Sequence, residues 1–172
     1  VRVSDATGRP LPQAVVTLEP VAGKLPVAAM TGVEIAQAKR QFTPQVTAET
    51  YGAWLRDLPT DQALSLYLHI PFCARLCWYC GCNTRAVNRH EPVGDYVRLL
   101  LDEIDLLGAA LPVRLAAGGI HFGGGTPNML STTEVDAIFD RLGQVFDLAP
   151  DIDIAVEMDP AVLTQDWVRA AG

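Results

Sequence analysis

The sequence predicts an α/β protein in which three strand and helix units follow one another along the chain. Two observations predict this class. Short apolar or β-branched runs occur three times, and after each run apolar residues recur every three or four positions, as on one face of a helix. Because successive units of this kind cross over with one hand, we expect the strands to be parallel and the helices to cover one face of the sheet.

A short helix over residues 49–58 is expected to precede the first unit. The first strand covers Leu64–Ile70 and ends at Pro71, which has no backbone N–H to donate to a sheet. The helix of this unit is expected over residues 95–107, where a stripe of apolar side chains recurs with helical spacing. These side chains are Tyr96, Leu99, Leu100, Ile104 and Leu107.

The second unit places a strand over residues 115–122 and a helix after Ser131. Ser131 and Glu134 have the spacing of a capping box, in which each side chain bonds the backbone N–H of the other residue. The third unit is a strand over residues 151–156 followed by a helix over residues 164–171. The apolar face expected for the second helix consists of Val135, Ile138, Phe139, Leu142 and Phe146.

Residues 1–47 differ from the rest of the chain and predict a short β-rich segment. They hold five basic and three acidic residues, whereas residues 48–172 carry a formal charge of about −9. An alternating strand, a turn over Asp5–Pro12 and a β-branched strand predict a hairpin, which resembles the opening strands of immunoglobulin-like or cupredoxin-like modules. We therefore divide the chain into a hairpin-like segment, foreign to the rest, and a domain over residues 48–172.

Composition excludes several classes of protein. With 49% hydrophobic and 19% charged residues and no apolar run of membrane-spanning length, the sequence predicts a globular protein without a membrane partner. The net charge of −7 argues against a broad surface for nucleic acid. We expect a monomer. Unpaired cysteines favour a reducing compartment, and we expect a cytoplasmic location.

All four cysteines lie within ten positions, at Cys73, Cys77, Cys80 and Cys82. Gaps of one to three residues close almost no loop, so disulfide bonds between them would stabilise little. A structural zinc site usually takes a second pair of ligands from elsewhere in the chain, whereas an iron–sulfur cluster takes a short run of thiolates. Iron–sulfur is therefore favoured over zinc, although both accept thiolates. Reduced, buried cysteines that pack as small hydrophobes are the third alternative.

The spacing also bears on the fourth ligand of such a cluster. If Cys73, Cys77 and Cys80 each bind one iron of a [4Fe–4S] cluster, one iron needs a further ligand. Cys82 is a candidate, but only Gly81 separates it from Cys80, which constrains the loop. An iron left open would accept a small molecule, and the site would then be catalytic.

Two further unusual features follow the second and third strands. Residues 123–125 are three consecutive glycines, which let a ligand approach the backbone closely, although a flexible turn closed by Pro127 has the same composition. Glu157 follows the third strand and can accept hydrogen bonds from two hydroxyl groups, as in a ribose. Because the carboxyl ends of parallel strands meet at one edge, we expect these features and the cysteines to form one ligand site.

Three segments carry a resemblance to a known family: residues 67–83, 121–127 and 156–160. Their sequences YLHIPFCARLCWYCGCN, HFGGGTP and VEMDP resemble those of radical S-adenosylmethionine enzymes. The Cys-Gly-Cys ending at Cys82 resembles the oxygen-independent coproporphyrinogen III oxidases (dehydrogenases) within that superfamily, whereas the related haem chaperones usually lack this extra cysteine. The resemblance covers about residues 49–172.

The resemblance implies a fold, cofactors and site residues. The fold would be the first three βα units of a partial (β/α)6 barrel, preceded by the β-rich segment. The implied cofactors are a [4Fe–4S] cluster and two molecules of S-adenosylmethionine. The implied cluster ligands are Cys73, Cys77 and Cys80. The residues implied to hold the first S-adenosylmethionine are Tyr67, Gly124 and Glu157. Those implied to help hold the second are Tyr79, Gly125 and Thr126.

The implied reaction is the oxidative decarboxylation of coproporphyrinogen III to protoporphyrinogen IX in haem biosynthesis. An electron donor would reduce the cluster, and a 5′-deoxyadenosyl radical would take hydrogen from a propionate side chain, so the cofactors carry the hard chemistry. We expect His69, His90 and His121 to be structural. Since the family has six βα units, the sequence is expected to be an inactive fragment. Alternatives are a haem chaperone and a β interaction module fused to a metal-binding fragment.

Overall fold

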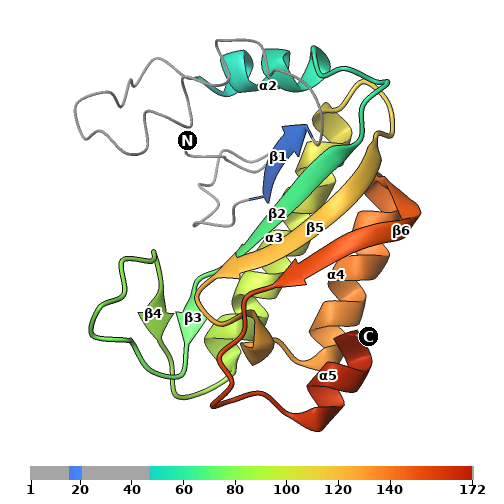
Figure 1. Ribbon diagram of the computed structural model, residues 1–172. Coiled ribbons are helices and arrows are strands. Elements are labelled where there is room, and N and C mark those ends of the chain that lie inside the picture. Colours follow the sequence, from blue (N-terminus) through green and yellow to red (C-terminus); the bar gives the residue numbers. More distant parts are fainter. Residues whose placement is uncertain (1–15, 21–46, 172) are drawn as a thin grey trace.

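The structure is a computed structural model that describes residues 16–20 and 47–171. Figure 1 gives the arrangement of its helices and strands. In chain order the elements are β1 (Val16–Pro20), α2 (Ala48–Arg56), β2 (Leu64–Ile70), β3 (Phe72–Cys73), β4 (Arg85–Ala86), α3 (Glu91–Ala110), β5 (Ala116–Gly124), the 3-10 turn η1 (Pro127–Met129), α4 (Thr132–Val145), β6 (Asp147–Val156) and α5 (Gln165–Ala171).

Among residues 16–20 and 47–171, four strands form the main sheet in the order β1-β2-β5-β6. Strands β2, β5 and β6 are parallel, as the sequence predicts. Ile70 at the end of β2 pairs with Gly124 at the end of β5, and Phe122 of β5 pairs with Val156 at the end of β6. The segments that follow these three strands therefore start at one edge of the sheet, in the lower part of Figure 1.

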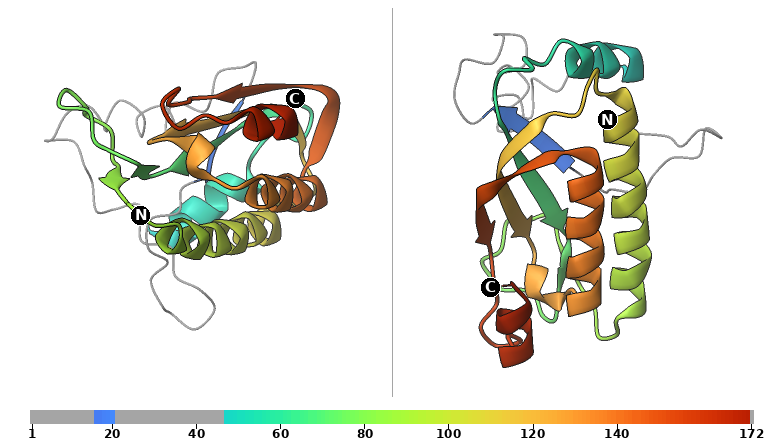
Figure 2. Two further views of the ribbon diagram at one scale, coloured as in Figure 1. Left: turned by 90° about the horizontal axis from the view of Figure 1, so that it is seen from below. Right: turned by 90° about the vertical axis from the view of Figure 1, so that its right-hand side faces the viewer.

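Helices α3 and α4 lie side by side on one face of the sheet (Figure 2). The period of their apolar residues places one stripe of each helix against the strands. A Cβ atom on Gly108 would lie 2.8 Å from Cγ1 of Val145, so this glycine lets the two helices approach closely. The residues of this layer that are almost fully buried include Leu64, Leu66, Leu68, Ile70, Leu100, Ile104, Ile138 and Leu142.

The opposite face of the sheet carries polar side chains. On β2 the residues that alternate with the buried leucines are Ser65, Tyr67 and His69, because successive strand residues point to opposite faces. The register pairs Tyr67 with His121 of β5, and their ring centroids lie 5.5 Å apart. In the part of the chain that the structure describes, α3 and α4 cover one face of the sheet (Figure 2), and the polar side chains of β2 belong to the other face.

Two elements begin four residues earlier than expected, and the other boundaries differ by no more than three residues. Helix α3 begins at Glu91 rather than at residue 95, because Pro92 fits the first turn of a helix, where its missing N–H is not needed. Strand β6 begins at Asp147 rather than at residue 151, since Asp147 N donates to Leu115 O at 2.9 Å and pairing starts there. The capping box of Ser131 is confirmed, with both of its hydrogen bonds present.

Strand β1 belongs to the segment 1–47 and pairs in the antiparallel sense with β2, with Val16 opposite Leu68. It corresponds to the second strand of the expected hairpin. The first strand and the turn lie outside the described residues, and the division at residue 47 stays a prediction. Within residues 47–171 and 16–20, none of the helices combines the length and apolar character needed to cross a membrane.

Arg114 closes the carboxyl end of α4. Its guanidinium donates to the carbonyl oxygens of Gly143 and Phe146, and it pairs with Asp147 at 2.8 Å. These carbonyls have no partner within the helix, so a cation that bonds them stabilises its end. We expect Arg114→Met, which keeps an aliphatic stem, to lower the free energy of unfolding by about 1–2 kcal/mol in urea titrations.

A matched control is Arg98→Met. Arg98 makes an exposed ion pair with Asp95, one turn away on the same helix. Such pairs contribute little, and we expect a change within about 0.5 kcal/mol. Equal losses from the two substitutions would show that Arg114 is another surface arginine and not a helix cap.

Candidate functional site

The loop that carries the cysteines, residues 73–86, is closed at its base. Strands β3 and β4 pair in parallel there. Arg85 N donates to Pro71 O at 3.0 Å, and Val87 N donates to Cys73 O at 2.9 Å. The base of this cysteine loop is thus fixed by backbone hydrogen bonds directly after β2. The sequence did not predict this pairing, because two strands of two residues each leave no periodic pattern.

The four cysteines are all free thiols. Cys73 is buried at the loop base, and its Sγ lies 3.3 Å from Oγ1 of Thr84. The thiols at the exposed tip of the loop are Cys77, Cys80 and Cys82. The interpretation of the cysteines as buried small hydrophobes is therefore wrong for three of the four.

The exposed thiols interact with one another. Cys82 N donates to Cys80 Sγ at 3.4 Å, and the hydrogen bond and charge of Cys80 raise the pKa of the Cys82 thiol. Among the described residues no three metal-ligating side chains converge closely enough to hold an ion as they stand. The donor set nevertheless fits a thiolate-bound cluster, since Cys77 and Cys80 lie on the exposed tip and Cys73 supplies a third thiol from the base of the same loop.

The three glycines lie against groups of the protein itself. Gly124 has a φ of 104°, and a Cβ atom there would overlap the ring of His69. A Cβ on Gly123 would lie 2.9 Å from Cε2 of Tyr67, and one on Gly125 would lie 2.5 Å from the carbonyl oxygen of Phe72. At Gly125 the clash is with the backbone and at Gly124 the φ is positive, so these two glycines are required by the packing of the turn onto β2 and β3, whereas at Gly123 the neighbours are ends of side chains.

Tyr67 and His69 connect β2 to the end of the cysteine loop. His69 Nε2 donates to Asn83 O at 2.9 Å, so Nδ1 of a neutral imidazole accepts from Tyr67 Oη at 3.1 Å. Burial raises the pKa of Tyr67 above its usual value, and the nearby Glu157 and Cys82 raise it further. The phenol therefore stays protonated at neutral pH and remains a donor.

Glu157 receives one hydrogen bond on each carboxylate oxygen. Gly124 N donates to Oε2 at 3.1 Å, and His121 Nε2 lies 3.3 Å from Oε1. A carboxylate can accept about four hydrogen bonds, so capacity for two remains. The side chain is 53% exposed, and a ligand can reach it. This arrangement fits the pair of hydroxyl groups of a ribose.

The structure brings some of the predicted site residues together and separates others. Tyr67, Gly124 and Glu157 lie in one group. Tyr79 lies on the exposed loop tip, where its ring contacts Trp78 edge-on at 5.7 Å. Thr126 is 3% exposed, and its N–H bonds the loop base. The cofactor roles of all these residues stay predictions.

His69 and His121 were expected to be structural, and both lie in the group around Tyr67. His69 follows Tyr67 by two residues on β2, whereas His121 is its partner on β5. Asn128 was not singled out. Its side chain is buried and bonds the backbone of Asp159 twice, which joins the two loops that follow β5 and β6. His90 lies elsewhere, paired with Glu134 at 2.9 Å.

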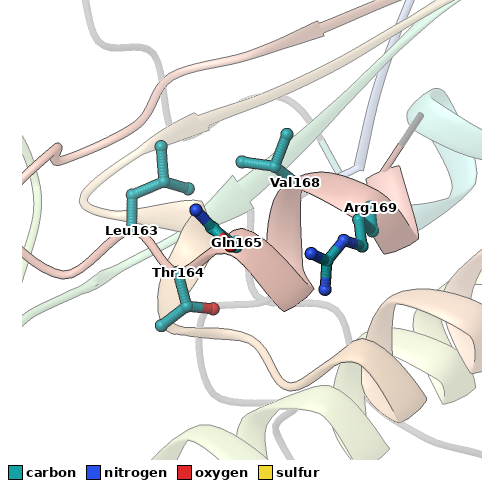
Figure 3. Close-up of a pocket in the computed structure, with 5 residues that line it drawn as sticks. All are labelled: Leu163, Thr164, Gln165, Val168 and Arg169. Carbon is teal, nitrogen blue, oxygen red and sulfur yellow. The ribbon is translucent and has the colours of Figure 1, made fainter.

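An open hollow of about 400 Å³ lies at the start of α5 (Figure 3). Its lining residues are Leu163, Thr164, Gln165, Val168 and Arg169. Its one charged side chain, that of Arg169, is paired with Asp166 at 3.0 Å. None of the site residues discussed above lines this hollow, and we assign it no role.

Comparison with known proteins identifies the family. A family model described as the Radical SAM superfamily matches residues 67–171, more than half of the chain. The chain belongs to the radical SAM superfamily. The match begins at Tyr67, and it includes the cysteine loop, the glycine turn and Glu157. The alternative of a β interaction module does not account for this match.

The chain is also similar to individual radical SAM proteins. It is 43% identical to the oxygen-independent coproporphyrinogen III oxidase of Bradyrhizobium diazoefficiens, over 75% of this chain and 29% of that protein. It is 38% identical to the protein of that name from Paracoccus denitrificans, over 69% of this chain and 26% of that protein. The chain thus spans less than a third of the length of these relatives.

A solved structure has the same fold. The coproporphyrinogen III oxidase of Escherichia coli, described as a radical SAM enzyme, matches with a TM-score of 0.71 and 25% sequence identity. The match covers 87% of this chain and 35% of that one. The expected α/β fold with parallel strands, part of a radical SAM domain, is therefore confirmed.

Two glycines of this radical SAM chain offer a matched test of the packing at the loop base. A Cβ atom on Gly125 would meet the carbonyl oxygens of Phe72 and Ile70 at 2.5 and 2.8 Å, whereas one on Gly81 would meet nothing within 4 Å. We expect Gly125→Ala to lower the free energy of unfolding by about 1–3 kcal/mol, as overpacking does. Gly81→Ala should change it by less than about 0.5 kcal/mol.

Denaturant titration of the metal-free protein measures both effects and keeps cluster binding out of the comparison. If Gly125→Ala were as mild as Gly81→Ala, the glycine turn would not be packed against β2 and β3 as described.

Proposed function

We propose that this radical SAM chain is part of an enzyme that oxidises coproporphyrinogen III to protoporphyrinogen IX without oxygen. The observation that carries the proposal is the meeting of the cysteine loop, Gly124 and Glu157 at one edge of the parallel sheet. The names and 36–43% identity of several relatives support the choice of substrate.

The proposed cofactors are a [4Fe–4S] cluster and S-adenosylmethionine, which together supply one-electron chemistry that starts with cleavage of the sulfonium. Cys73, Cys77 and Cys80 would hold the cluster. The chain's other residues bind and orient the second cofactor. Glu157 has acceptor capacity for two ribose hydroxyls, and Gly124 fixes one of its carboxylate oxygens.

Polar side chains on the face of the sheet opposite α3 and α4 position the site. Tyr67 donates to His69, and His69 donates to the carbonyl oxygen of Asn83 at the end of the cysteine loop, so the loop is tied to β2. His121 donates to Glu157 and holds one of its carboxylate oxygens in place. These bonds are made within the protein and hold the groups in place, which lowers the entropic cost of binding a ligand.

The proposal is restricted to one molecule of S-adenosylmethionine. Of the residues expected for a second molecule, Tyr79 is 75% exposed at the loop tip whereas Thr126 is 3% exposed at its base. An external electron donor must reduce the cluster. We also propose a reducing compartment, the cytoplasm, because all four thiols are free.

Cluster binding is tested by anaerobic reconstitution with iron and sulfide, followed by metal analysis and EPR. We expect a reducible [4Fe–4S] signal that Cys77→Ala abolishes. Cys82→Ala is the matched control, and it should keep the signal, because Cys82 is not among the three proposed ligands. Bound zinc without iron would refute the proposed metal site, and loss of the signal in Cys82→Ala would refute the set of three ligands.

The reaction is tested in two steps with the reconstituted protein and S-adenosylmethionine. Reduction should release 5′-deoxyadenosine. We expect added coproporphyrinogen III to lose CO2 with a protein of the relatives' full length and not with this chain alone, which spans less than a third of that length. Release of 5′-deoxyadenosine without decarboxylation by the full-length protein would contradict the substrate but not the cofactor. Stoichiometric haem binding without decarboxylation would favour a haem chaperone.

A further inference from the structure

A buried amide continues the pairing of β5 and β6 beyond the ends of both strands. Asn128 Nδ2 donates to Asp159 O at 3.1 Å, and Asp159 N donates to Asn128 Oδ1 at 3.0 Å. The side chain thus offers one donor and one acceptor, as a backbone residue does in a sheet. Asn128 is 6% exposed, so both hydrogen bonds are shielded from water.

This pairing holds the segment around Glu157 from its far side. On the near side, Glu157 N donates to Phe122 O at 2.9 Å, which extends the strand ladder by one bond. On the far side, Asp159 is held by Asn128, and only Met158 lies between the two anchors. The Glu157 side chain is 53% exposed, so burial does not hold it in place. Its position depends on the backbone at both ends, together with the hydrogen bonds from Gly124 N and His121.

The turn η1, which carries Asn128, is itself anchored. Met129 N donates to Thr126 O at 2.9 Å, and Nε1 of Trp167 donates to Leu130 O at 3.0 Å. Trp167 is 7% exposed and packs in the core cluster. Because its own segment is fixed at both ends, Asn128 can impose a position on Asp159.

We propose that Asn128 is a positioning residue for the Glu157 carboxylate. The inference rests on the proposed binding of S-adenosylmethionine at that carboxylate. A carboxylate that is held in one place before the ligand arrives loses less conformational freedom on binding and therefore binds more tightly. An aspartate at position 128 would keep the acceptor but lack the donor, and an alanine would lack both.

Binding of S-adenosylmethionine to the reconstituted chain, measured by equilibrium dialysis, tests the proposal. We expect Asn128→Asp to weaken binding about tenfold, which corresponds to ~1.4 kcal/mol. Asn88→Asp is the matched control, because it makes the same change of charge at an exposed position in the loop before α3. It should change affinity by less than about twofold.

A double-mutant cycle separates positioning from a general loss of structure. If Asn128 acts through Glu157, then Asn128→Asp should weaken binding less than about twofold in a Glu157→Ala background, because no carboxylate remains to be positioned. The same tenfold loss in both backgrounds would overturn the proposal.

Hydrogen exchange of the cluster-free protein gives a readout independent of the cofactor. Asn128→Asp should speed exchange at residues 157–160 and leave α3 unchanged. Asn128→Ala serves if Asn128→Asp does not fold. Faster exchange with unchanged affinity would overturn the proposal. A wild-type chain that binds no S-adenosylmethionine would instead refute the proposed function, and this inference with it.

Discussion

The parallel register of β2 and β5 is the constraint on which the rest of the site depends. It sets Tyr67 beside His121 and brings the end of β2 level with Gly124. The cysteine loop leaves β2 at that level, and the glycine turn leaves β5 there. A slip of one residue would turn the polar side chains toward α3 and α4 and the buried leucines toward the ligand. The apolar period of β2 prevents this, so core packing also fixes the chemistry.

The residues of the glycine turn have to meet two requirements at once. A ligand needs access to backbone groups, and the protein needs the turn to lie against β2 and β3. The second requirement is visible at Gly124 and Gly125, where an added Cβ atom would overlap His69 or meet the backbone of Phe72. Glycine at these positions therefore does not by itself indicate a ligand. The observation that points to a ligand is the neighbouring Glu157 carboxylate, which has spare capacity to accept hydrogen bonds.

Much of the fold could be predicted from the sequence, because burial against one sheet face imposes periods of two and about three and a half residues. The start of α3 was misplaced because Pro92 interrupts the pattern without interrupting the helix. The candidate site was proposed from its unusual residues, and their cofactor roles stay predictions. His69, His121 and Asn128 were not included, since a single polar residue has no period, and its role depends on partners far away in the sequence. For Asn128 that partner is 31 positions away.

The closed base of the cysteine loop separates the chemistry of the thiols from the integrity of the domain. Backbone bonds on either side of β3 and β4 hold the base, while Cys77, Cys80 and Cys82 contribute nothing to the buried core. Oxygen damages clusters of this kind, and a protein that relied on its cluster to stay folded would be lost with it. Here the backbone bonds at the loop base and the packing of the sheet on its helices do not involve the thiols at the tip. Loss of a cluster bound at that tip would therefore leave the contacts that hold the domain together in place.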